Sequence, residues 1–89
     1  MEIKVEITHR SGSLKKHRMA AGLSQSQLAN ATGLNVRTLQ HYEQGTKDIN
    51  AAKLSTILKL CNALNCSLRE LLSDPETMDL LDEYEARNI

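Results

Sequence analysis

Two helix starts follow each other closely in the middle of this chain, and they constrain the fold more than any other feature. Ser24 and Gln27 have the spacing of a capping box, in which each side chain bonds the other residue's backbone N–H. Asn35 is a second N-cap residue eleven positions after Ser24. Gly33 stands between them, where a helix end commonly adopts the left-handed conformation. The segment 23–39 therefore predicts two short helices separated by a three-residue turn.

Apolar residues around each cap fix the limits of these two helices. A leucine before the cap and another at the fourth helical position pack together as a hydrophobic staple. The expected pairs are Leu23 with Leu28 and Leu34 with Leu39. The helices are thus predicted over about residues 25–32 and 36–44, and Gly45 ends the second.

Caps and helical spacing also predict helices on both sides of this pair. A first helix covers residues 13–21, and Gly22 ends it. Asn50 is expected to cap a helix that reaches residue 64 and buries one apolar stripe. The stripe comprises Leu54, Ile57, Leu58, Cys61 and Leu64.

Two further caps follow toward the C-terminus. Ser67 and Glu70 form another capping box, which opens a short helix through residue 72 or 73. Asp74 followed by Pro75 is typical of a cap and a first helical residue. The helix that this pair opens carries three larger side chains along one side, namely Met78, Leu81 and Tyr84.

The predicted helices need an aliphatic core, because the 89-residue chain contains no Trp or Phe. No strand pattern interrupts residues 13–73, so the sequence predicts an all-α fold, a compact five-helix domain followed by an extra C-terminal helix. We divide the chain into an extension over residues 1–12, this domain over 13–73 and an acidic, helical tail over 74–89. The side chains expected inside are Leu14, Leu23, Leu28, Ala29, Leu34, Leu39, Tyr42, Ile49, Leu54, Ile57, Leu58, Cys61, Leu64, Leu68, Leu71 and Leu72.

The extension has a different pattern from the rest of the chain. Ile3, Val5 and Ile7 alternate with charged residues, as in a half-buried strand. One strand cannot stabilise itself. The extension is therefore expected to pack on the helices, to pair with a copy of itself or to be disordered.

The zero net charge conceals an uneven distribution. Residues 1–73 contain ten Lys or Arg and five Asp or Glu, a net charge of +5, and the last sixteen residues carry −5. A basic body with an acidic tail is compatible with phosphate binding by the body, since attraction depends on the local field. An ordinary solvated tail explains the acidic residues equally well.

Several functional classes find no support in the sequence. Cys61 and Cys66 are too few for a disulfide framework and, with three scattered histidines, show no metal-ligand spacing. No catalytic pair or phosphate-binding glycine loop is present at usable spacing, so we expect neither an enzyme nor a cofactor. No apolar run is long enough to span a bilayer, and no signal-peptide pattern opens the chain. We expect a cytoplasmic protein with no membrane contact.

The helix predicted over residues 36–44 has a polar face opposite Leu39 and Tyr42. Helical spacing places five residues on that face, namely Val36, Arg37, Gln40, His41 and Gln44. Arg side chains can bond guanine, Gln side chains can bond adenine, and a Val methyl can contact thymine in the major groove. A solvated face of an ordinary amphipathic helix is the alternative. The position of this helix, second in a tight helix-turn-helix, favours base recognition.

From Leu14 to Leu72 the chain resembles the phage repressor and Cro-type helix-turn-helix family, also called the XRE family. The resemblance covers about two thirds of the chain. Its motifs are Leu14, Arg18, Gly22-Leu23-Ser24-Gln25, Leu28-Ala29, Gly33-Leu34, Leu39, Tyr42-Glu43-Gln44-Gly45 and Ala63-Leu64-Asn65-Cys66-Ser67-Leu68. It implies a lambda-repressor-like fold and a sequence-specific regulator of transcription, a repressor, that binds double-stranded DNA at a palindromic operator as a homodimer.

The resemblance also assigns roles to individual residues. Gln25 would donate to a DNA phosphate, and the start of the recognition helix would enter the major groove. The DNA-binding candidates are Gln25, Ser26, Asn35, Val36, Arg37, Gln40, His41, Gln44, Thr46 and Lys47. Arg18 and Glu43 would instead form a buried salt bridge. We expect the fold not to need six of these candidates, namely Gln25, Asn35, Val36, Arg37, Gln40 and His41.

Two departures and one alternative accompany this resemblance. Thr32 stands where relatives commonly have an aliphatic residue, and His17 where many have Leu or Ile, so packing is expected to be slightly looser there. The alternative function is that of an antitoxin-like module, whose extension and acidic tail bind a protein partner while the helix-turn-helix regulates its own gene.

Overall fold

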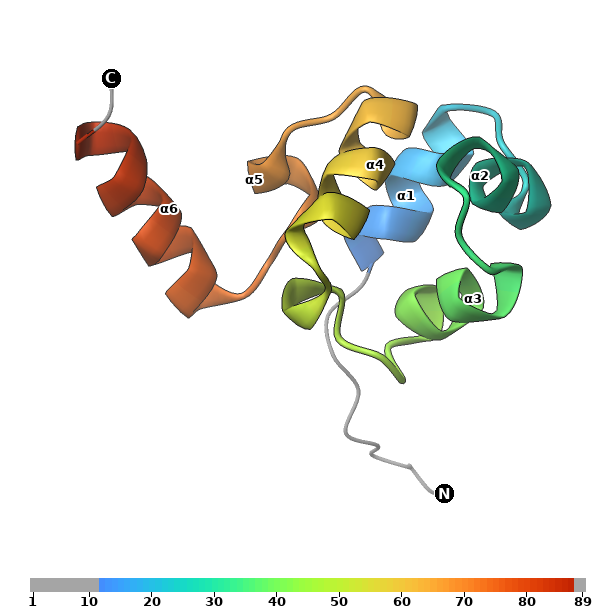
Figure 1. Ribbon diagram of the computed structural model, residues 1–89, viewed down its shortest axis with the longest axis horizontal. Helices are drawn as coiled ribbons and strands as arrows, with labels where there is room; N and C mark the ends of the chain where they lie inside the picture. Colours follow the sequence, from blue (N-terminus) through green and yellow to red (C-terminus); the bar gives the residue numbers. More distant parts are fainter. Residues whose placement is uncertain (1–11, 88–89) are drawn as a thin grey trace.

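The computed structural model describes residues 12–87, and within them the chain is all-helical (Figure 1). The elements in order are α1 (Gly12–Ala20), α2 (Gln25–Thr32), α3 (Val36–Gln44), the 3-10 turn η1 (Ile49–Ala51), α4 (Leu54–Leu64), α5 (Leu68–Leu71) and α6 (Pro75–Arg87). The all-α prediction is confirmed. The predicted strand pattern of the extension lies outside the described residues.

The caps at the centre of the chain form as predicted, and α2 and α3 have the predicted limits. The Ser24 hydroxyl accepts from the Gln27 N–H at 3.0 Å, and the Gln27 side chain accepts from the Ser24 N–H at 2.8 Å. Gly33 ends α2 at φ +74°, a left-handed conformation that would strain an L side chain. The Asn35 side chain then caps α3. Local sequence therefore determines the turn between these helices.

One core unites the first five helices and η1. The largest fully buried side chains are Leu14, Leu28, Leu39, Ile49, Leu60 and Leu71. They come from α1, α2, α3, η1, α4 and α5 respectively, and we call these six elements the body. Each element of the body therefore contributes one of these fully buried side chains to the same interior. Burial of each such side chain stabilises the fold by roughly 1.5–3 kcal/mol.

The predicted apolar stripe of α4 is wrong in part. Leu54 and Leu58 are 63% and 41% exposed, whereas Leu60, which we did not predict, is fully buried. The buried residues are Ile57, Leu60, Cys61 and Leu64. At 100° per residue they span an arc of about 100°, and Leu58 lies about 110° from its centre. Leu54 opens the helix at the edge of the core.

Asn50 does not cap α4, contrary to the prediction. Asp48 caps η1 by accepting from the Asn50 N–H at 3.0 Å, and α4 begins after Lys53 without a side-chain cap. The side-chain Oδ1 of Asn50 instead accepts from the backbone N–H groups of Ser73 and Asp74, both at 3.1 Å. Asn50 therefore joins η1 to the segment that leads into α6.

The last two helices also start at the predicted caps. The Ser67 and Glu70 capping box is complete, although α5 ends at Leu71, one or two residues earlier than predicted. The Asp74 carboxylate accepts from the Thr77 N–H at 3.0 Å at the start of α6. None of the side chains of α6 is buried, and the helix stands apart from the body in Figure 1.

Thr32 is accommodated without an unpaired polar group. It is buried, but its hydroxyl donates to the carbonyl oxygens of Leu28 and Ala29 at 2.8 and 3.2 Å within α2. Internal pairing of this kind removes most of the cost of burying a hydroxyl.

Among helices of the described chain, none combines the length and apolar character needed to cross a bilayer.

The revised face of α4 gives a direct test of the core. Leu60→Ala should lower the free energy of unfolding by about 3 kcal/mol, because it leaves a cavity among fully buried side chains. Leu58→Ala is the matched control on the same helix and should cost about 1 kcal/mol or less, since that side chain is already 41% exposed. Urea unfolding curves measure both. Equal losses would contradict the observed orientation of α4.

Candidate nucleic-acid interface

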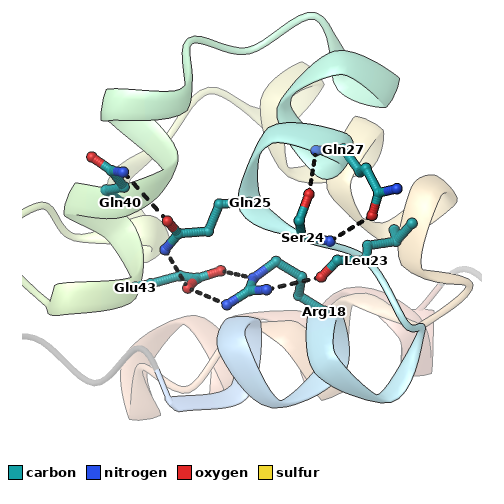
Figure 2. A network of polar contacts seen from close by, with 7 residues as sticks. All are labelled: Arg18, Leu23, Ser24, Gln25, Gln27, Gln40 and Glu43. Carbon is teal, nitrogen blue, oxygen red and sulfur yellow. Dashed lines mark hydrogen bonds and ion pairs between the residues drawn. The ribbon is translucent and has the colours of Figure 1, made fainter.

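A charged pair joins α1 to α3 beneath the helix-turn-helix (Figure 2). Arg18 Nε donates to Glu43 Oε2 at 2.6 Å, and its Nη2 donates to Oε1 at 3.0 Å. Arg18 Nη1 also donates to the carbonyl oxygen of Leu23 at 2.8 Å, just before α2 begins. The two charged side chains are 11% and 3% exposed. The hydrogen bond to Glu43 raises the pKa of Arg18, so this guanidinium stays charged. The ion pair implied by the family resemblance is present.

Gln25 and Gln40 extend this pair to the face of α3. Gln25 Nε2 donates to Glu43 Oε1 at 3.0 Å, and Gln40 Nε2 donates to Gln25 Oε1 at 3.3 Å. Figure 2 shows the resulting chain of contacts from Arg18 through Glu43 and Gln25 to Gln40. We define these four residues as the polar relay. The expectation that the fold does not use Gln25 and Gln40 is therefore wrong, because the relay holds both side chains in place.

The exposed face of α3 lies opposite its buried face. Leu39 and Tyr42 are buried. The other side carries the five residues named from the sequence, Val36, Arg37, Gln40, His41 and Gln44, of which Gln40 and His41 are half-buried and the rest exposed. At 100° per residue these five occupy an arc of about 140°. The arc is wide enough to present several side chains to one groove at once.

The two ends of α3 are fixed by side chains that are also site candidates. Asn35 Oδ1 accepts from the Arg37 N–H at 2.8 Å, so the fold uses Asn35 as a cap. His41 Nδ1 lies 2.8 Å from the Thr46 hydroxyl, and the His41 carbonyl oxygen accepts from the N–H groups of Thr46 and Lys47 at 3.0 and 3.2 Å. The fold therefore also uses His41. The remaining candidates, Ser26, Val36, Arg37, Gln44, Thr46 and Lys47, are all exposed.

In residues 12–87 no group of three His, Cys, Asp or Glu side chains could hold a metal ion. Burial raises the pKa of Cys61 to about 11 and also raises that of Cys66, so both cysteines favour the thiol form over the reactive thiolate.

Residues 13–73 carry eight basic and three acidic side chains. The part of the chain that carries α3 therefore has a net charge of +5.

A family model described as helix-turn-helix matches residues 14–71, from Leu14 in α1 to the end of α5. The chain belongs to this family. The match covers α2, α3 and the polar relay, and it ends before α6. The family assignment made from the sequence is confirmed.

The relatives that this chain resembles include named regulators. It is 34% identical over 67 residues to the transcriptional repressor RstR of the cryptic phage CTXphi of Vibrio cholerae, covering 75% of this chain and 58% of RstR. The restriction-modification controller protein C.AhdI of Aeromonas hydrophila is similar at 37% identity and TM-score 0.62, over 70% of this chain and 89% of that structure. The biofilm regulator SinR, solved in complex with DNA, matches 71% of this chain and all of its own at TM-score 0.66. With 24% identity, SinR supports the fold alone.

Loss of Arg18 tests the energetic weight of the polar relay. Arg18→Ala should lower the free energy of unfolding by about 3 kcal/mol, because it leaves the Glu43 carboxylate buried without its cation. The double variant Arg18→Ala with Glu43→Ala should be less destabilised than the two single variants added together, since it removes both charges. Thermal and urea unfolding of all three variants give the coupling. Simple additivity would show that the pair is energetically independent.

Proposed function

We propose that this chain is a sequence-specific transcriptional repressor that places α3 in the major groove of an operator. The observation that carries the proposal is the exposed polar arc of α3, presented by a capped turn and braced from below by the polar relay. The relatives add support, because RstR is named a transcriptional repressor and C.AhdI a controller protein. The DNA-binding unit in this proposal is residues 13–73.

The proposal divides the exposed residues by the chemistry each can supply. Arg37 can bond the two acceptors on the major-groove edge of guanine, and Val36 can contact a thymine methyl. Lys47 and Thr46 follow α3 and are suited to phosphate oxygens. Ser26, on α2, and Gln44, at the end of α3, are exposed and would add polar contacts. Base-reading and phosphate-binding residues thus come from adjoining parts of one element and its following loop.

The two glutamines of the relay can serve the fold and the DNA together. A Gln side-chain amide has two N–H donors. In Gln25 one of them bonds Glu43, which leaves the second for a phosphate near the N-terminus of α2, where anions are favoured. In Gln40 one donor bonds Gln25, and its other N–H and its carbonyl oxygen suit the two-point pattern of adenine. The relay would then fix the orientation of both side chains before DNA arrives.

A symmetric dimer follows from the proposed function. Helix-turn-helix proteins of this kind bind palindromic sites as dimers, with half-sites about one helical turn apart. One copy of α3 can contact only a few base pairs, so two copies are needed for a specific operator. The names of RstR and C.AhdI do not favour the antitoxin alternative.

Alanine variants of two basic residues separate base reading from phosphate binding. Arg37→Ala should relax the preference at one base position and weaken cognate binding by roughly 5- to 150-fold, the range expected from loss of a bidentate contact. Lys47→Ala should weaken cognate and random duplexes by similar factors and reduce the salt slope of log K by about 1. Lys59→Ala is the matched charge control, because Lys59 lies beside Ala31 and Thr32 at the C-terminal end of α2. It should change binding by less than about threefold.

Selection of random duplexes by the purified protein provides the cognate site for these measurements and reports palindromy and spacing. Binding is then followed by fluorescence anisotropy at several salt concentrations. Equal effects of Arg37→Ala on cognate and random DNA would refute base reading by Arg37. No affinity for any duplex at low salt would refute the function itself.

A further inference from the structure

The polar relay has a direction, because its inner end is an acid. Glu43 is the carboxylate of the ion pair with Arg18, and its side chain is 3% exposed. A carboxylate accepts hydrogen bonds and donates none. Gln25 therefore turns its NH2 group toward Glu43 Oε1, 3.0 Å away, and keeps its own carbonyl oxygen on the other side. The charge of one buried residue thus sets the orientation of the Gln25 amide.

Gln40 takes the next place in this series of bonds. Its Nε2 donates to Gln25 Oε1 at 3.3 Å, and its Oε1 lies on the side away from Gln25 (Figure 2). If the Gln40 amide were turned over, two carbonyl oxygens would face each other and the bond would be lost. Both side chains are half-buried, which makes such a loss costly. The relay therefore leaves Oε1 and one N–H of Gln40 for an outside partner.

A glutamine held in one orientation is more selective than one that turns freely. In the major groove adenine and cytosine present exocyclic amines, whereas guanine and thymine present the carbonyl oxygens O6 and O4. A free glutamine can bond either kind, because rotation of its amide offers a donor or an acceptor. The fixed Oε1 of Gln40 accepts from an amine and is repelled by a carbonyl oxygen. Adenine fits best, since its N7 also accepts from the second N–H.

We propose that Gln25, oriented by Glu43, is a positioning residue that makes Gln40 select an amine-bearing base, adenine first, and reject guanine and thymine. The inference rests on the proposed function and deepens it, because the discrimination at one operator base then depends on a residue that does not touch that base. Arg37 lies outside the relay and carries only donors, so its preference for guanine needs no such neighbour.

Binding ratios at single operator positions test this role of Gln25. Gln40→Met first identifies the base pair that Gln40 reads, as the position at which the preference disappears. The wild-type chain should bind adenine there at least about tenfold more tightly than guanine, within the range for a two-point contact. Gln25→Met keeps the ion pair of Arg18 with Glu43 but frees the Gln40 amide, so this ratio should fall below about threefold. Loss of the Gln25 phosphate contact weakens all duplexes alike and cancels in the ratio.

Two controls separate this effect from a general disturbance of the fold. The preference at the base read by Arg37 should be the same in Gln25→Met as in the wild-type chain. Asn62→Leu removes an exposed amide from α4, outside the relay, and should leave every ratio within about twofold of the wild-type value. Competition measured by fluorescence anisotropy gives the ratios, and circular dichroism checks that each variant is folded. An equal fall at the bases read by Arg37 and Gln40 would contradict the positioning role.

Side-chain 15N relaxation of the free chain reports the same orientation without DNA. The NH2 group of Gln40 should be ordered in the wild-type chain and mobile in Gln25→Met. A wild-type Gln40 amide as mobile as that of exposed Gln44 would overturn the inference. So would a Gln25→Met chain that keeps the wild-type ratio, a wild-type preference for guanine or thymine at the base read by Gln40, or a Gln40→Met chain with every base preference intact. A chain that binds no duplex would instead refute the proposed function, whatever the relaxation data show.

Discussion

The ion pair between Arg18 and Glu43 is the interaction on which the geometry of the reading surface depends. It connects α1 to α3, and its third bond, to the carbonyl oxygen of Leu23, fixes the chain just before α2. A buried pair of this kind contributes modestly to net stability, because desolvation offsets much of the attraction. Its value lies in geometry, since guanidinium and carboxylate meet at two points and allow little rotation. Three helices therefore have one defined arrangement.

The polar relay shows how that arrangement reaches the surface. Glu43 accepts from both Arg18 and Gln25, and Gln25 in turn accepts from Gln40 on the exposed arc of α3. Each bond selects a rotamer of a side chain that would otherwise be mobile, and the entropic cost of ordering it is met during folding rather than on binding. Packing of Leu39 against the core and capping by Asn35 hold the helix itself. The surface is thus preorganised in both backbone and side chains.

The parts of this structure that the sequence predicts are those in which the interacting residues lie close together along the chain. The Ser24 and Ser67 capping boxes act over three residues, and Gly33 needs only its own backbone conformation, so the limits of α2 and α3 follow directly. The sequence does not predict the role of Asn50, because its side-chain Oδ1 accepts from the N–H groups of Ser73 and Asp74, more than twenty residues away. The burial of Leu60 and exposure of Leu58 likewise depend on which neighbours cover α4, and periodicity alone does not define that face.

The same contrast applies to the candidate site. Helical spacing is enough to place five residues on one face of α3, namely Val36, Arg37, Gln40, His41 and Gln44. No local signal in the sequence shows that Gln25 and Gln40 are hydrogen-bonded to each other. Their pairing changes how a variant there must be interpreted, because Gln25→Ala would remove a phosphate donor and also release Gln40. Arg37 and Lys47 are the clearer probes, since their exposed side chains lie outside the relay. If an alanine variant at either residue loses affinity for DNA, the loss therefore reports a missing DNA contact rather than a disturbed fold.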